Sequence, residues 1–168
     1  MITDLIQIRR LGAKKLGENA QFRKHLKRHK FVEPKFRRMA LEVEDKVDCR
    51  QCANCCKVAT TRISVRDVEK LARFLRMRPA EFIRQYAIET EEEGLILRRD
   101  ERKGCVFLSG NDCTIYEARP HTCENFPHLV RGEGSLLSRM WDMPDRACYC
   151  PIVYNTLEAF KCEVGFLR

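Results

Sequence analysis

Residues 49–56 have the sequence Cys-Arg-Gln-Cys-Ala-Asn-Cys-Cys, which places four of the ten cysteines of the chain within eight residues. The first three follow a C-x2-C-x2-C spacing, so one short loop can fold their sulfurs around a single centre. This spacing occurs in bacterial ferredoxins, where a distant cysteine completes the ligand set. C-x2-C alone is equally common in zinc sites. The stretch therefore predicts a metal-centred domain and leaves the metal open.

The last two cysteines of this stretch, Cys55 and Cys56, are adjacent in sequence. Neighbouring side chains of an extended chain point to opposite sides. We therefore expect the pair to serve two neighbouring centres, or to supply one ligand and one packed thiol, because cysteine also behaves as a small buried hydrophobe.

A predicted hairpin carries the next two cysteines. Residues 105–108 are a predicted strand, 109–112 have the composition of a turn, and 114–116 would return along the first strand. This hairpin would bring Cys105 and Cys113 close together.

Four more cysteines follow towards the C-terminal end. Cys123 comes after Pro120 redirects the chain, so we expect its thiol to join the same region. Cys150 precedes a proline, as ligand cysteines do in ferredoxins. Cys148 could share a strand face with Cys150, and its role stays open. Cys162 is expected to be an ordinary core or surface thiol.

Soft thiolates select zinc, copper(I) or iron–sulfur clusters over magnesium or calcium. Eight thiols fit two four-thiolate centres, or one cluster with additional redox thiols. A disulfide framework is disfavoured, because disulfide-dense domains are usually small and secreted. The eight predicted metal ligands are Cys49, Cys52, Cys55, Cys56, Cys105, Cys113, Cys123 and Cys150.

Polar residues surround these thiols. His121 is expected to form a hydrogen bond near the centre rather than to ligate. Arg50, Lys57 and Arg119 are either ordinary surface charge or would offset the negative charge of a thiolate site, which raises the potential of a cluster.

Hydrophobic periodicity and turn residues predict an α+β fold, a small cysteine-rich domain with short helices and β-hairpins. Ser64 and Asp67 resemble a capping box. An extended linker is expected over 31–48. Helices are predicted over 3–30, 65–75, from Pro79 to Tyr86 and over 152–160, with a strand at 94–97 and a hairpin over 129–137.

The charge is concentrated at the N-terminal end. Of the net charge of +8, residues 1–48 carry +6, with 13 Lys/Arg against 7 Asp/Glu. We expect a basic helical N-terminal arm over residues 1–46, followed by the cysteine-cluster metal-binding domain over 47–168. The run over residues 23–30 is either an ordinary solvated helix face or a surface that attracts an acidic protein or nucleic acid. No aromatic residue interrupts that run, so the sequence gives little support for base stacking.

Beyond the C-x2-C-x2-C-C stretch, the chain contains Cys105-Val-Phe-Leu, Cys113-Thr-Ile-Tyr-Glu-Ala-Arg-Pro-x2-Cys123-x2-Phe-Pro and a late Cys150-Pro. With these motifs in this order, residues 47–155 resemble the CxxCxxCC cysteine-cluster (YkgJ-type) family, described as zinc- or iron-chelating. They are also distantly similar to flagellin lysine N-methylases, which are associated with an iron–sulfur cluster and S-adenosylmethionine.

The favoured interpretation is a metal-binding protein with an iron–sulfur cluster, with four irons and four sulfides as one form, or with zinc as the alternative. It would act as a redox, electron-transfer or accessory module. The resemblance implies a second hypothesis, a protein-lysine methyltransferase-like enzyme, although no glycine-rich methyl-donor loop is evident. A third is a zinc-containing nucleic-acid-binding protein. No signal-peptide pattern or membrane span is present, so a cytoplasmic location is expected.

Overall fold

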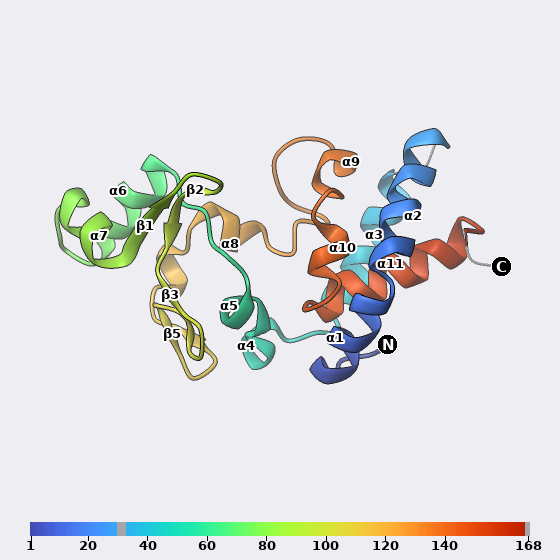
Figure 1. Cartoon of the computed structure of the whole chain (residues 1–168), viewed down its shortest axis with the longest axis horizontal. Helices are drawn as coiled ribbons and strands as arrows, with labels where there is room; N and C mark the ends of the chain where they lie inside the picture. The colour runs from blue at the N-terminus through green and yellow to red at the C-terminus, as the bar shows by residue number, and fades with distance from the viewer. Residues whose placement is uncertain (30–32, 167–168) are drawn as a thin grey trace. The chain divides into compact units, whose positions relative to one another are not determined.

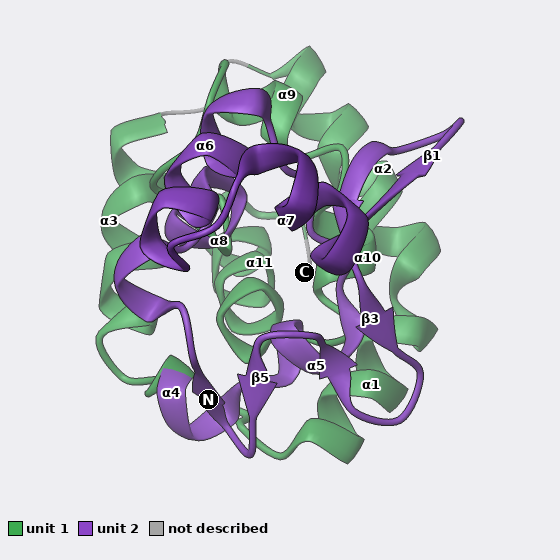
Figure 2. Ribbon diagram, turned by 90° about the vertical axis from the view of Figure 1, so that its left-hand side faces the viewer, with its two compact units in different colours: residues 1–49, 126–168 green, residues 50–125 purple. Residues whose placement is uncertain are grey.

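The computed structural model describes residues 1–29 and 33–166. These residues form two compact units (Figure 2). Unit 1 contains residues 1–49 and 126–168, and unit 2 contains residues 50–125. Short helices and small antiparallel strand pairs confirm the α+β class. No helix in the described ranges has the length and hydropathy needed to cross a membrane.

Unit 1 is helical in its described residues and is organised around its last helix, α11. α11 packs against α1, α3 and α10, while α2 contacts α1, α9 and α10 (Figure 1). The helix predicted over 152–160 is confirmed as α11, which begins one residue earlier, at Pro151. The helices are α1 (Leu5–Lys14), α2 (Leu16–Arg28), α3 (Glu33–Glu44), α9 (Leu136–Arg139), α10 (Met143–Arg146) and α11 (Pro151–Glu163).

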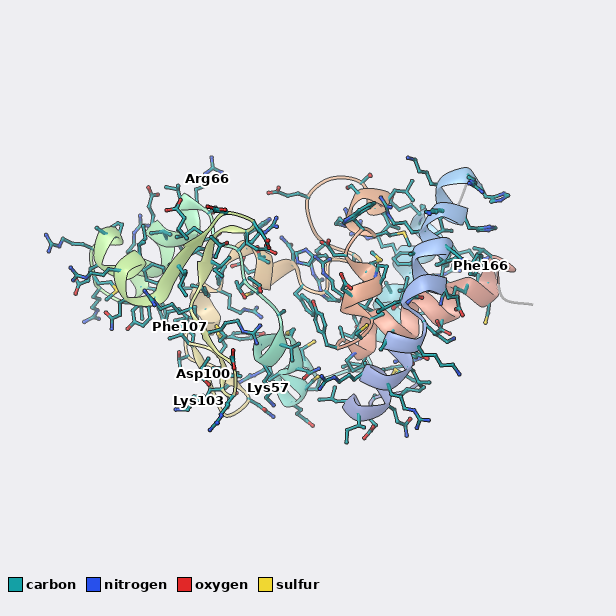
Figure 3. The ribbon with its side chains drawn as sticks, viewed as in Figure 1. Lys57, Arg66, Asp100, Lys103, Phe107 and Phe166 are labelled. Atoms are coloured by element: carbon teal, nitrogen blue, oxygen red, sulfur yellow. The ribbon has the colours of Figure 1, made fainter. Side chains whose placement is uncertain are left out.

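Aromatic side chains from separate helices form the centre of unit 1. The ring of Phe160 lies 5.0 Å from that of Phe36 and 6.1 Å from that of Phe22, both edge-on. Phe166, beyond the end of α11, lies 5.0 Å from Phe22 (Figure 3). Edge-to-face aromatic pairs contribute about 0.5–1.5 kcal/mol beyond their buried area, so these contacts join α2 and α3 to α11.

A buried lysine adds a polar contact to this core. Lys161 is fully buried, and its Nζ donates to Glu18 at 2.5 Å and to Glu158 at 2.6 Å. Lys15 also pairs with Glu158. A buried charge is tolerated only when it is paired, so the two glutamates make this position of α11 acceptable for lysine.

Three sequence predictions in unit 1 were wrong. The helix expected over 3–30 is interrupted at Lys15, and Lys30 lies outside the described residues. The linker expected over 31–48 contains helix α3, because Pro34 occupies a first helical turn, where its missing N–H costs nothing; residues 31 and 32 are not described. The hairpin expected over 129–137 is absent from these described residues, since Ser135 caps α9 instead.

Helix α1 approaches the backbone of the segment that follows α10. A Cβ on Gly12 would lie 2.5 Å from the carbonyl oxygen of Ala147 and 2.6 Å from the Cα of Cys148. Both are backbone atoms, which cannot rotate away. Gly17, at the start of α2, has no atom within 4 Å of the corresponding position.

Substitution of these two glycines should have opposite effects. Gly12→Ala is expected to lower the free energy of unfolding by about 1–3 kcal/mol, because the added methyl forces two backbones apart. Gly17→Ala is expected to raise it by about 0.4–1 kcal/mol through the unfolded state. Urea denaturation followed by circular dichroism measures both. Equal effects of the two substitutions would contradict the close approach at Gly12.

Unit 2 combines short helices with three two-stranded antiparallel ribbons, and α4 begins at the boundary between the units. The helices are α4 (Cys49–Cys52), α5 (Asn54–Val58), α6 (Val65–Phe74), α7 (Pro79–Tyr86), η1 (Tyr116–Ala118) and α8 (His121–Asn125). The strands are β1 (Ala87–Thr90), β2 (Gly94–Leu97), β3 (Arg99–Asp100), β4 (Gly104–Cys105), β5 (Leu108–Ser109) and β6 (Asp112–Cys113).

Each ribbon pairs strands that are consecutive in the sequence. β1 pairs with β2, β3 with β4, and β5 with β6. In the last ribbon Leu108 faces Cys113 and Ser109 faces Asp112, so the turn predicted between Cys105 and Cys113 is confirmed. The return strand is β6, slightly earlier than expected. The ribbons share one core with α6 and α7, in which Phe107 stacks on Phe82 at 6.3 Å. Phe107 is labelled in Figure 3.

The predicted capping box at the start of α6 is confirmed, and it also holds α8. Asp67 accepts hydrogen bonds from the backbone N–H and the hydroxyl of Ser64, at 2.9 and 2.7 Å. Its second oxygen accepts the backbone N–H of His121 at 2.9 Å. Burial raises the pKa of Asp67, but these hydrogen bonds and the charge of Lys70 outweigh it, so the pKa is lowered overall.

Because the folded-state pKa of Asp67 is depressed, its contribution to stability is present above the unfolded value, about pH 4. The contribution is lost as the pH falls through the folded pKa. Asp67→Asn should lower the unfolding free energy by about 1–3 kcal/mol at pH 7. The difference in unfolding free energy between this variant and the wild type should become smaller below about pH 4. Urea titrations across this range measure it. Glu69→Gln, on an exposed position of α6, is the control. A gap that does not change with pH would contradict the role of the carboxylate.

Candidate metal centre

The adjacent cysteines of the central motif lie in a helix. Cys55 and Cys56 are in α5, which begins after Ala53, a residue with a left-handed backbone (φ 45°). The expectation that they point to opposite sides of an extended chain was wrong, since successive helical side chains diverge less. The thiol of Cys55 forms a hydrogen bond with that of Cys56. The pair therefore belongs to one local site.

A glycine brings the second cysteine group against this helix. Strand β4 contacts α5, and Gly104 is the residue where the two backbones meet. A Cβ on Gly104 would lie 2.6 Å from the carbonyl oxygen of Cys56 and 2.7 Å from the Cα of Lys57. Its φ of +84° is also a conformation that favours glycine. Cys105 is the next residue, so this approach places its thiol near Cys56.

Side chains from two ribbons hold the C-terminal end of α5. Arg99 of β3 donates to the carbonyls of Val58 and Lys57, at 2.6 and 2.8 Å. These carbonyls lie in the last turn, where intrahelical partners are lacking. Asn111, in the turn of the β5–β6 ribbon, accepts from the Lys57 ammonium at 2.6 Å and donates to the carbonyl of Gln51 at 2.8 Å. These contacts hold the C-terminal end of α5, and Asn111 connects it to α4.

The thiols of the ribbons accept hydrogen bonds from the backbone. The N–H of Phe107 donates to the sulfur of Cys105, and the N–H of Ile115 donates to that of Cys113. In each case the donor is two residues further along the chain. A backbone N–H stabilises negative charge on sulfur, which is the form in which cysteine binds metal.

Cys123 enters the same region from α8. Its sulfur lies 3.8 Å from the hydroxyl of Thr61. Burial raises the pKa of Cys123 to about 12, despite the hydrogen bond to Thr61, and the charges of Cys105, Cys56 and Cys113 act in the same direction as burial. These interactions show that the four thiols lie close enough to influence one another.

Positive charge acts on three of the four thiols, but only the pKa of Cys56 is lowered overall. The hydrogen bond with Cys55 lowers the pKa of Cys56 to about 7, and Arg119 and Lys57 add to this effect while partial burial opposes it. Burial raises the pKa of Cys105 and of Cys113. Cys56 is therefore the thiol of this group that ionises most readily.

We call Cys56, Cys105, Cys113 and Cys123 the four-thiol group. It lies within unit 2 and draws on α5, β4, β6 and α8. Across the described ranges, no three His, Cys, Asp or Glu side chains are already arranged around a point that would hold a single metal ion.

The other predicted ligands lie in different places. Cys49 and Cys52 are the two ends of α4, one helical turn apart. Cys150 is buried at the start of α11 in unit 1. All ten cysteines are thiols, with no disulfide among them.

The remaining cysteines and His121 have local roles. The thiol of Cys148 lies 3.5 Å from the carbonyl of Pro144, and Cys162 is exposed on α11, as expected of a surface thiol. His121 is exposed, and its ring contacts the amide of Asn125 at 2.7 Å.

Comparison with known protein families agrees with this geometry. Residues 48–151 match the sequence model of a family described as "CxxCxxCC: Putative zinc- or iron-chelating domain". The chain belongs to the CxxCxxCC family. The match spans the cysteines from Cys49 to Cys150 and all of the four-thiol group, and the family description supports metal binding. No solved structure matches the chain.

Several residues that shape the site were missed by the sequence analysis. Gly104, Arg99, Asn111 and Thr61 position the thiols but carry no metal-ligand chemistry of their own. For these residues, the sequence offered one indication of a role at the site, which is that Gly104 immediately precedes Cys105. Of the basic residues considered, Lys57 and Arg119 act on Cys56, while Arg50 pairs with Asp112 at 3.5 Å.

The approach at Gly104 predicts a selective loss of stability and metal. Gly104→Ala is expected to lower the unfolding free energy by about 2–4 kcal/mol, from a strained φ and a backbone clash. Its metal-to-protein ratio should fall, because α5 must move away from Cys105. Gly110→Ala is the control, since it has a similar φ of +62° and no atom within 4 Å. It should cost only about 1–2 kcal/mol and keep its metal. Equal metal content in both variants would contradict the assigned role.

Proposed function

We propose that this protein binds an iron–sulfur cluster through cysteine thiolates and acts as a redox or electron-transfer module. The observation that carries the proposal is the four-thiol group, in which thiols from four separate elements interact with one another. Four thiolates are a complete ligand set for a [2Fe–2S] or a [4Fe–4S] cluster. They are equally a complete set for structural zinc, so the metal is decided by experiment.

Two features favour a cluster over zinc. The C-x2-C-x2-C spacing and the Cys150-Pro151 pair are found in ferredoxins. Backbone N–H groups also donate to the sulfurs of Cys105 and Cys113. Hydrogen bonds to sulfur are one of the means by which proteins set the potential of a cluster.

The charges around the group suit a redox role. Arg119 and Lys57 act on Cys56, and Arg99 acts on Cys105. Positive charge near the sulfurs stabilises the reduced, more negative form of a cluster and raises its potential. Cys49, Cys52, Cys55 and Cys150 stay predicted ligands, and single substitutions test each of them.

The metal is tested on protein purified without oxygen. The iron–sulfur proposal expects brown protein that contains iron and acid-labile sulfide, with visible absorption that bleaches on reduction. Colourless protein with stoichiometric zinc, prepared in the same way, would overturn the cluster and retain the thiolate site.

The ligands are tested by single substitutions. Cys56→Ser, Cys105→Ser, Cys113→Ser and Cys123→Ser should each lose most of the bound metal, since a lost ligand leaves a site open. The bound metal of the corresponding serine variants of Cys49, Cys52, Cys55 and Cys150 shows whether each of these cysteines is a ligand. Cys162→Ser, at an exposed position of α11, is the matched control and should bind as wild type does. Full metal content in all variants of the four-thiol group would refute this assignment.

A further inference from the structure

The tryptophan of this chain, at position 141, lies on the surface of unit 1. Trp141 is 68% exposed, the most exposed aromatic side chain among the described residues. It lies between α9 and α10, and both of these helices contact α2. Its large, rigid ring is therefore accessible for contact with a partner.

An arginine of α2 occupies one face of this ring. The guanidinium carbon of Arg23 lies 4.1 Å from the centre of the Trp141 ring, a cation–π distance. Because the side chain is nevertheless 68% exposed, the opposite ring face is open to solvent. Arg23 therefore covers one face of the ring, and most of the side chain stays accessible for stacking.

Further positive charge extends from this contact along α2. Lys27 is one helical turn beyond Arg23, on the same side of the helix, and Lys24 lies beside it; both are exposed. Within the described residues, no ion pair neutralises Arg23, Lys24 or Lys27. The Nε of Arg23 is buried and has no hydrogen-bond partner among the residues that the structure describes.

The acidic residue next to the tryptophan does not cancel this charge. Asp142 pairs with Arg146, its Oδ2 lying 2.8 Å from the guanidinium. A flat aromatic surface beside uncompensated lysines is the arrangement that binds single-stranded nucleic acid, in which bases stack and phosphates meet the charges. An acidic peptide would use the charges and leave the ring face without a stacking partner.

We infer that Arg23, Lys24, Lys27 and Trp141, all in unit 1, form a binding surface for single-stranded nucleic acid. One base stacks on the open face of Trp141, and the neighbouring phosphates contact Lys24 and Lys27. No base-specific group is required, so binding is expected to depend little on sequence.

The chain's lone tryptophan gives a direct readout, since its fluorescence reports on this surface alone. Oligo(dT) and oligo(U) are added to the full-length protein at low salt. We expect both to quench the fluorescence, with affinity that falls steeply as salt increases. Comparison of the two distinguishes DNA from RNA as the preferred strand.

Substitutions separate stacking from charge. Trp141→Ala should weaken binding, measured by anisotropy of a labelled oligonucleotide, by about 5- to 150-fold, while Trp141→Phe retains part of the affinity. Lys24→Gln and Lys27→Gln should each reduce the log–log salt slope by about 0.7. Lys103→Gln, at an exposed position of unit 2 (Figure 3), is the charge-matched control. It should change neither the affinity for the oligonucleotide nor the salt slope.

Three results would overturn the inference: no binding at low salt, binding that Trp141→Ala leaves unchanged, or poly-glutamate that binds as tightly as the oligonucleotides. The last result would identify an acidic protein segment as the partner. Circular dichroism of Trp141→Ala checks folding, which the exposure of the side chain predicts to be intact. Loss of metal from the wild-type protein should not alter the result, so this test is independent of the proposed cluster.

Discussion

The contact between two backbones at Gly104 is the constraint on which the candidate metal centre depends. Cys56 and Cys105 are far apart in the sequence, and they become neighbours because a residue without a side chain lets β4 lie against α5. Arg99 and Asn111 then hold the short helix in place. A five-residue helix would not be stable alone, so its thiols are positioned by these tertiary contacts.

The electrostatics of the four-thiol group follow from this packing. Burial opposes ionisation of Cys105, Cys113 and Cys123, and each thiolate also disfavours the next. Hydrogen bonds and nearby cations favour ionisation of Cys56. A bound metal would compensate the repulsion that the thiolates otherwise exert on one another. Without a metal, the raised pKa values keep Cys105, Cys113 and Cys123 protonated, and a bound cation would favour their thiolate forms.

Local sequence patterns predicted much of the secondary structure. They could not predict which residues far apart in the sequence come into contact. The Ser64–Asp67 capping box and the prolines at 79 and 151 each determine a helix start within a few residues. The linker expected over 31–48 contains α3, because Pro34 can begin a helix as well as end one. The candidate thiols were found from chemistry and spacing. Gly104 and the pairing of Arg23 with Trp141 depend on which segments meet in space, and no short motif encodes that.

Unit 1 is built from two ends of the chain, and this has a consequence for its synthesis. Its first three helices leave the ribosome before α11 exists, although Phe22 and Phe36 are buried against Phe160. At ~5–20 residues per second, the intervening residues take roughly 5–20 s to make. During that interval the apolar faces of α2 and α3 are exposed in the nascent chain, while unit 2, which is continuous in sequence, can already fold. The nascent chain would then be most open to chaperones, or to aggregation, between the synthesis of α3 and that of α11.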